Sequence, residues 1–182
     1  MDENLKNEFP KTYLNILAAF AGESQARNKY DFFAKVARKE GHQKLADFFE
    51  ETAKNEQEHA KLLLKLLKGI GNSKNNLQEC IDGEHYENQE MYPNFEKIAQ
   101  EEGFQDAQKL FSKLAKIEKH HEERYKRLLN QLENDILYSS REEKISWICK
   151  KCGNVHKGLE APDVCPVCSH PKGYYEKEQQ EY

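Results

Sequence analysis

The most constraining feature of the sequence is a repeated helical pattern in which a glutamate and a histidine interrupt an apolar face. The segment NEQEHAKLLLKLL (55–67) has the 3.6-residue periodicity of an amphipathic helix, yet Glu56 and His59 lie on its apolar side. Glu118 and His121, at a constant offset of 62 residues, interrupt a second apolar face in the same way. The two halves of the chain are therefore expected to form similar helical hairpins related by a pseudo-twofold axis.

A second match between the halves precedes these pairs. The segment GESQARNKYDFFAKVARKEG (22–41) resembles GEHYENQEMYPNFEKIAQEEG (83–103), with one extra residue in the second copy. Glu23 and Glu84 occupy matching places in the two segments. A helical repeat alone indicates only a packing unit, so the chemistry has to be read from the residues on its apolar faces.

Residues 1–138 have a helical composition, rich in Glu, Lys, Leu, Ala and Phe, with glycine mostly at segment edges. Pro93 is expected to kink the third helix, and residues 69–76 to form the longest loop. Short loops within each half and a longer connection between them are typical of a mainly α, antiparallel four-helix bundle with one crossover. The expected helices cover residues 10–40, 42–68, 77–101 and 104–138.

Every expected helix carries an acid at about the same depth of its apolar face. Any one of these glutamates alone would be interpreted as a solvated side chain. Carboxylates and imidazoles that face one another inside a bundle are very costly without compensating positive charge, and two metal ions supply that charge. One Glu from each of two helices plus Glu-x-x-His from the other two is the ligand pattern of the ferritin-like dimetal site. Oxygen and imidazole ligands favour iron or manganese and tolerate zinc.

Further candidates surround this site. Glu87 lies three residues after Glu84 and can reach the same cavity, as a fifth carboxylate that binds in only one oxidation state or as a surface acid. Tyr30 and Tyr92 occupy matching places in the repeat, either as core aromatics or as hydrogen-bond and proton donors to the site, and the second interpretation is preferred. His85, beside Glu84, is either a hydrogen-bond donor to the ligands or a surface residue, and the second interpretation is preferred.

The C-terminal part of the chain has a different character. Cys149-x-x-Cys152 and Cys165-x-x-Cys168 together supply four thiolates to one tetrahedral metal, and this spacing is a strong signal. Zinc and a single iron both satisfy such a site, so a zinc ribbon stays open. The polar segment 139–146 is interpreted as a linker between a helical domain at 1–138 and a cysteine domain at 147–182.

Composition excludes several classes of function. The formal net charge of −4 argues against nucleic acid or an anionic membrane as the main partner, and no apolar run is long enough to cross a bilayer. The N-terminus lacks the basic-then-apolar order of a secretion signal. We therefore expect a cytoplasmic protein, where five cysteines are not expected to form structural disulfides.

The motif order GESQAR, Glu-x-x-His, GEHYE, MYP, Glu-x-x-His, CxxCG and CPVC resembles the rubrerythrin family over essentially the whole chain. The resemblance implies a ferritin-like di-iron bundle joined to a rubredoxin-like iron domain. In the family, the acid matching Glu87 and the histidine matching His59 exchange places on one iron as the oxidation state changes. Ser169 replaces the glycine that usually follows the second cysteine pair. The implied di-iron ligands are Glu23, Glu56, His59, Glu84, Glu87, Glu118 and His121, and the implied ligands of the third iron are Cys149, Cys152, Cys165 and Cys168.

The same resemblance implies a peroxidase of oxidative-stress defence that reduces hydrogen peroxide to water. An NAD(P)H-linked reductase would deliver electrons through the rubredoxin-like iron, and Glu87, Tyr30 or Tyr92 would supply protons. A homodimer or larger assembly, head-to-tail or helix-swapped, is expected, and recombinant material can carry zinc at the cysteines. One alternative is a ferroxidase or iron-storage protein, which has no need of the cysteine module. The other, a zinc-ribbon adaptor on an inert bundle, requires every helical ligand to be coincidental.

Overall fold

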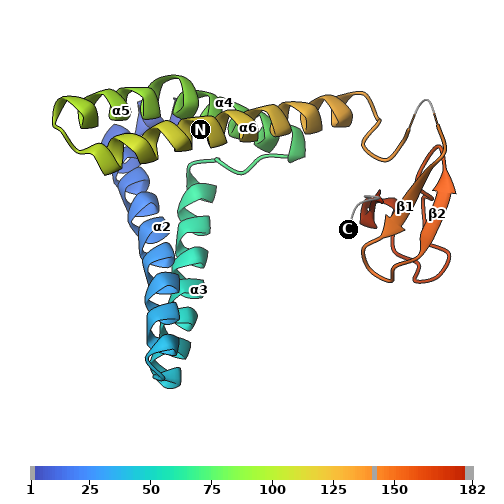
Figure 1. Ribbon diagram of the computed structural model, residues 1–182, viewed down its shortest axis with the longest axis horizontal. Coiled ribbons are helices and arrows are strands. Elements are labelled where there is room, and N and C mark those ends of the chain that lie inside the picture. Colours follow the sequence, from blue (N-terminus) through green and yellow to red (C-terminus); the bar gives the residue numbers. More distant parts are fainter. Residues whose placement is uncertain (1–2, 141–142, 179–182) are drawn as a thin grey trace. The chain divides into compact units, whose positions relative to one another are not determined.

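The computed structural model describes residues 3–140 and 143–178, which fall into two compact units divided between Asn72 and Ser73. Most of the described residues are helical, and a small sheet follows the last helix, so the predicted fold class is confirmed (Figure 1). None of the described helices combines the length and apolar composition that crossing a bilayer requires. The predicted domain limits stay a prediction, and their residues 1–2, 141–142 and 179–182 lie outside the described part of the chain.

The first unit is a helical hairpin of α2 (Pro10–Lys39) and α3 (Gln43–Leu66), which run side by side (Figure 1). Pro10 occupies the first turn of α2, where its missing N–H leaves no hydrogen bond unmade. Gly41 has a φ of +86°, a left-handed conformation that favours glycine and reverses the chain. Both helices match their predicted ranges to within two residues, whereas the short α1 (Glu3–Glu8) was not predicted.

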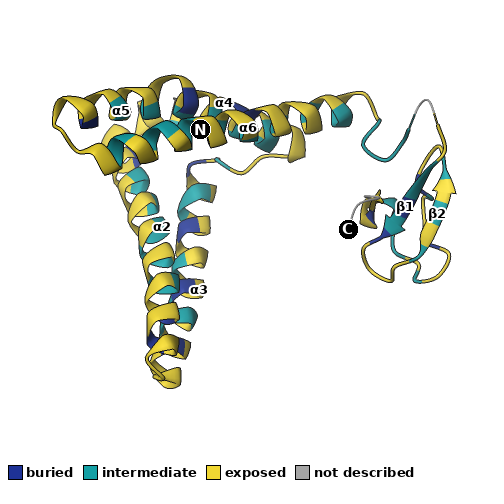
Figure 2. Cartoon of the chain, viewed as in Figure 1, coloured by how far each residue is buried: buried dark blue, intermediate teal, exposed yellow. Residues whose placement is uncertain are grey.

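Small side chains bring the two helices of this hairpin close together. The buried residues of α3 are alanines at intervals of seven, at positions 46, 53 and 60, and Ala34 and Ala37 of α2 are buried as well (Figure 2). Arg38, near the end of α2, links the two helices, because its guanidinium donates to both carboxylate oxygens of Glu50 on α3 at 3.0 and 2.7 Å. The alanine stripe of α3 therefore forms the contact with α2. The neighbouring face of α3, which carries Glu56 and His59, is not used in this contact.

The second unit contains a hairpin whose first arm is interrupted. The arm consists of α4 (Ser73–Tyr86), the π-helical turn η1 (Glu87–Met91) and α5 (Tyr92–Glu101), and it packs against α6 (Gln105–Glu133). The predicted third helix thus begins four residues too late, and the predicted loop 69–76 is in fact the shorter connection 67–72. The predicted fourth helix extends five residues too far at its C-terminal end, because α6 ends just before Asp135, which takes a left-handed φ of +54°.

The π-helical turn accounts for the position of Pro93 in the chain and for the extra residue of the second repeat. A π turn takes one more residue than an α turn at little change in helix direction, and it commonly marks functional sites. The N–H of Tyr92 donates to the carbonyl of Glu87, five residues earlier. The predicted simple kink at Pro93 is therefore corrected: the wider turn lies just before Pro93, which has no N–H and sits in the first turn of α5.

The cysteine module is a three-stranded antiparallel sheet in the order β2–β1–β3. Its strands are β1 (Ile145–Cys149), β2 (Val155–Gly158) and β3 (Tyr175–Lys177), with a 3₁₀ turn, η2 (Lys172–Tyr174), before the last. Trp147 is fully buried beneath the cysteines, and its indole N–H donates to the carbonyl of Gly158 at 3.1 Å. An aromatic core thus supports a module too small to have a large apolar interior.

Candidate metal centres

The first hairpin brings three of the predicted ligands together. Glu23 extends from α2, and Glu56 and His59 extend from adjacent turns of α3. Nδ1 of His59 lies 2.8 Å from a carboxylate oxygen of Glu56 and 3.6 Å from one of Glu23. All three ligand atoms lie within 4.8 Å of one another. We call this set the first cluster.

The second hairpin repeats this arrangement almost atom for atom. Nδ1 of His121 lies 2.8 Å from Glu118 and 3.5 Å from Glu84, so each distance agrees with its counterpart to within 0.1 Å. We call Glu84, Glu118 and His121 the second cluster. Donors about 2.1 Å from one metal ion lie up to roughly 4.2 Å apart, so the separations between the histidine and each carboxylate fit a shared ion. Two hard carboxylates and an imidazole suit iron.

The electrostatics of the second cluster show what a cation would relieve. Burial raises the pKa of Glu84, and the neighbouring Glu118 adds to this effect while His121 opposes it. Burial and the charge of Glu118 likewise raise the pKa of Glu87. The pKa of Tyr92 is raised by burial and by the charge of Glu87. The crowding and burial of these carboxylates thus favour their neutral, protonated forms. A bound cation would instead favour the charged forms.

Glu87 and the two tyrosines surround the clusters without belonging to either set of three. Glu87 is the first residue of η1, one turn after Glu84. Tyr30 stacks on Phe49 with ring centroids 6.4 Å apart, and Tyr92 lies at 6.0 Å from Phe111 in the matching place. Both tyrosines therefore have a core-packing role, and Tyr92 also lies within the electrostatic influence of Glu87.

A buried polar network beside the second cluster was missed by the sequence analysis. Glu122 is only 5% exposed, and its carboxylate accepts hydrogen bonds from the amide of Asn88 at 2.8 Å and from Lys126. Nδ1 of His85 lies 3.0 Å from the same carboxylate, and its side chain is 57% exposed, so His85 is the predicted surface residue and also a hydrogen-bond partner of Glu122. The hydrogen bond from Lys126, with those from Asn88 and His85, holds the pKa of Glu122 at about 2.

The network ties η1 to α6. Asn88 belongs to η1 and also donates to the backbone carbonyl of Glu84 at 2.6 Å, so one amide bridges the π turn, α4 and α6. The first hairpin has Ala60 where the repeat offset places Glu122. An acid at a position where the other copy buries an alanine is the sequence signal that could have revealed it.

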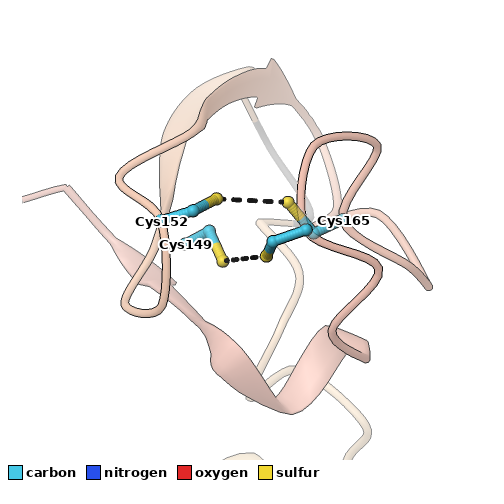
Figure 3. A group of neighbouring side chains, drawn as sticks. Cys149, Cys152 and Cys165 are labelled. Carbon is cyan, nitrogen blue, oxygen red and sulfur yellow. Dashed lines mark hydrogen bonds between the residues drawn. The ribbon is translucent and has the colours of Figure 1, made fainter.

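The four cysteines of the C-terminal module converge on one point. Their sulfurs lie 3.8 Å apart for Cys149 and Cys168 and 3.7 Å apart for Cys152 and Cys165 (Figure 3). Sulfurs at the corners of a tetrahedron around a metal 2.3 Å away would be ~3.8 Å apart, so the spacing fits a bound ion. The predicted set of four is brought together as expected, and Cys80 lies elsewhere, on α4.

The two cysteine loops have the same backbone conformation. The N–H of Gly153 donates to the carbonyl of Cys149 at 2.8 Å, and the N–H of Ser169 donates to that of Cys165 at 2.9 Å. Gly153 has a φ of +76° and Ser169 a φ of +58°, so serine adopts the left-handed conformation in place of the usual glycine. The departure from the family pattern leaves the loop geometry intact.

A hydrogen-bonded tyrosine favours the thiolate of one cysteine. The hydroxyl of the buried Tyr175 donates to Cys165 and lowers its pKa to about 6. Asn154 orients that hydroxyl by donating to its oxygen at 3.0 Å. A thiolate is the form that binds metal, but burial and the neighbouring sulfurs raise the pKa of Cys168 to about 12, so ionisation of all four thiols calls for a compensating cation.

Both parts of the chain are similar to known proteins. Residues 15–129 match the sequence model of a family described as rubrerythrin, and residues 147–176 match that of the rubrerythrin rubredoxin-like domain. The chain is 39% identical to a putative rubrerythrin of Methanocaldococcus jannaschii, covering 94% of this chain and 95% of the relative. It is 40% identical to a rubrerythrin of Porphyromonas gingivalis, with 100% and 96% covered. For a rubrerythrin of Nitratidesulfovibrio vulgaris the identity is 41%, with 91% and 93% covered.

The network around Glu122 generates a prediction about stability. Replacing Asn88 by Ala removes two hydrogen bonds that hold η1 and leaves part of a buried carboxylate unpaired, so the free energy of unfolding should fall by about 1–3 kcal/mol. Urea denaturation of the metal-free protein measures this change. The matched control is Gln78→Ala, which removes an exposed hydrogen bond to Asp82 on α4 and should change stability by less than about 0.5 kcal/mol. Equal effects of the two substitutions would contradict the role given to Asn88.

Proposed function

Because the chain belongs to the rubrerythrin family, we propose that it reduces hydrogen peroxide to water at a di-iron site in its helical domain. Family membership confirms several predictions: a ferritin-like helical domain, a rubredoxin-like domain, two irons held by Glu and His groups, and a further iron held by four cysteines. The family consists of di-iron proteins of oxidative-stress defence. The peroxidase reaction, its electron donor and the roles of individual residues are our proposal.

The observation that carries the proposal is the near-identity of the two Glu–Glu–His clusters. Each cluster offers two carboxylates and one imidazole, which is half of the ligand pattern of a dimetal site. Two ferrous ions, when bound, together hold the two electrons that cleavage of the peroxide O–O bond requires. The proposed ligands of the pair are the six cluster residues and Glu87 (Glu23, Glu56, His59, Glu84, Glu87, Glu118 and His121).

The reaction H₂O₂ + 2e⁻ + 2H⁺ → 2H₂O needs protons as well as electrons. Glu87 is the proposed donor to the departing oxygen, because it lies beside the second cluster and on a turn whose position Asn88 and Glu122 fix. Tyr92 lies within the influence of the same carboxylates and is the proposed source of further protons, with Tyr30 as its counterpart in the first hairpin. The aromatic contacts of both tyrosines would exclude water from that end of the site.

The cysteine module is the proposed entry point for electrons. Cys149, Cys152, Cys165 and Cys168 would hold the iron through which an NAD(P)H-linked reductase supplies electrons one at a time. The reducing interior of a cell suits such free thiolates, so we place the protein in the cytoplasm. We propose a homodimer or a larger assembly, in which electrons can pass to the helical site of a partner subunit, as in a head-to-tail arrangement.

Ferroxidase or iron-storage activity is the second candidate, since the same helical ligands would serve it. A storage protein needs no separate iron with sulfur ligands. The presence of four cysteines at a spacing that fits one metal ion therefore favours the peroxidase.

The proposed electron path predicts that a cysteine variant loses steady-state turnover but keeps single-turnover peroxide reduction. Cys149→Ser should abolish steady-state peroxide turnover with a reductase, because electrons can no longer enter. The same variant, first reduced chemically, should still consume peroxide in a single turnover at the rate of the natural protein. Cys80→Ser is the matched control, since Cys80 lies outside the module, and it should retain both reactions. Normal steady-state turnover by Cys149→Ser would show that electrons bypass the module.

The proposed role of Glu87 as proton donor predicts that its loss slows the reaction without removing iron. Glu87→Gln should slow single-turnover peroxide reduction by at least about 100-fold, the lower range for loss of a general acid. Its iron content should stay near that of the natural protein, because the two clusters keep their six ligands. Glu90→Gln, a neighbouring acid on η1, is the control and should react at the natural rate. If the Glu87 and Glu90 variants react equally fast, the proton comes from another group.

A further inference from the structure

One sulfur of the cysteine module is contacted by a side-chain hydroxyl as well as by the backbone. Tyr175 is 3% exposed and lies in the same core as Cys165, which is 1% exposed. The hydroxyl of Tyr175 donates a hydrogen bond to the sulfur of Cys165, and the backbone N–H groups of Val167 and Cys168 donate to it as well. The hydroxyl is therefore a contact to a metal ligand that a change of side chain removes while the backbone donors stay.

Neighbouring groups fix the direction of this hydroxyl. The amide of Asn154 donates to the hydroxyl oxygen of Tyr175 at 3.0 Å, so the hydroxyl proton is directed away from Asn154 and is available to the sulfur. Asn154 is itself held, because its backbone carbonyl accepts a hydrogen bond from the N–H of Cys149 at 2.9 Å. The backbone of Tyr175 is held by the sheet, where it begins β3 and lies opposite Cys149 of β1. The donor thus belongs to the same rigid frame as the cysteine ligands.

Burial makes this hydrogen bond sensitive to the charge of the site. Water competes little for a hydroxyl and a sulfur that are both almost fully buried, and a low local dielectric strengthens the bond between them. Four thiolates around a ferric ion leave one negative charge, and reduction to ferrous iron adds a second. A donor at a sulfur therefore stabilises the reduced form more than the oxidised form. Hydrogen bonds to the sulfurs are among the factors that set the reduction potential of iron with sulfur ligands.

We propose that Tyr175, oriented by Asn154, raises the reduction potential of the iron held by the four cysteines. Tyr175 is a positioning residue, because it acts on the iron through the sulfur of Cys165. The functional consequence rests on the proposed electron path. A higher potential favours transfer of each electron from the reductase to this iron and lowers the driving force for its onward transfer to the helical site. The hydroxyl thereby sets how the driving force is divided between the two transfers.

Tyr175→Phe tests the proposal, because it removes the hydroxyl and keeps the ring in the core. Spectroelectrochemistry of the full-length, iron-loaded protein measures the midpoint potential at the absorption bands of the sulfur-ligated ferric iron. The equilibrium constant for reduction of this iron should fall by about tenfold, which lowers the midpoint potential of a one-electron couple by about 59 mV. The sulfur-to-iron charge-transfer bands should move to longer wavelength, because a thiolate that lacks the hydrogen bond gives up charge more easily. An unchanged potential would overturn the proposal.

Tyr174→Phe is the matched control, since it removes the same group from the neighbouring residue. Tyr174 is 43% exposed, and its ring packs against that of His170 with the centroids 4.6 Å apart. The potential and the charge-transfer bands of this variant should equal those of the natural protein. Equal shifts in the two variants would mean that loss of packing changes the potential, and the role given to the Tyr175 hydroxyl would be wrong.

Asn154→Ala tests the orienting contact and leaves the tyrosine in place. Its potential should fall by less than that of Tyr175→Phe, because the hydroxyl stays but is no longer directed at the sulfur. In a Tyr175→Phe background the same change should have no further effect, whereas two additive shifts would contradict orientation by Asn154. If Tyr175→Phe binds no iron, Asn154→Ala decides alone, and a natural potential in that variant would overturn the proposal.

The proposed function can fail separately from this role of Tyr175. Normal steady-state turnover by Cys149→Ser would reject the electron path, and the potential of Tyr175→Phe would still show whether the hydroxyl acts on the iron. A natural potential in Tyr175→Phe, together with loss of steady-state turnover in Cys149→Ser, would reject the role of Tyr175 and leave the electron path standing.

Discussion

The cost of placing carboxylates on an apolar helix face is the constraint on which the rest of the structure depends. Removing an ionised group from water costs several kcal/mol even after the surroundings relax, so such a face is stable only when a cation or a partner compensates it. Each hairpin offsets part of this cost by placing an imidazole beside two carboxylates. The distances between these groups are nearly identical in the two hairpins. Completion of the charge balance requires a bound cation.

The departure from symmetry is as informative as the repeat. The second hairpin has one extra residue, which the π-helical turn absorbs and which brings Glu87 to the edge of its cluster. It also has Glu122 where the first hairpin has Ala60, and the Glu122 carboxylate holds Asn88 and thereby the turn. The metal-binding frame is thus shared by both halves, whereas the proposed proton donor and its support exist in one half only. A symmetric frame with an asymmetric reactive group is suited to a peroxide molecule, whose two oxygens must be treated differently.

Much of this arrangement could be predicted from the sequence, because its signals are periodic and local. The Glu-x-x-His pairs and the cysteine pairs each have a spacing that fixes their geometry: each Glu-x-x-His pair meets one glutamate of its own hairpin, and the four cysteines lie together. The interruption of the third helix was misplaced at Pro93, because a π turn differs from an α turn by one residue and leaves the apolar pattern almost unchanged. The network of Glu122 was missed because a buried acid with polar partners on another helix has no signature within its own segment.

The most direct test of the central claim is Mössbauer spectroscopy of the natural protein loaded with iron. The two clusters joined as one site should give a spin-coupled iron pair in the oxidised state, together with a sulfur-ligated iron, in a ratio of about two to one. Addition of hydrogen peroxide to the fully reduced protein should convert the pair from ferrous to ferric. Isolated, uncoupled irons in each hairpin, or iron at the cysteines alone, would contradict the account.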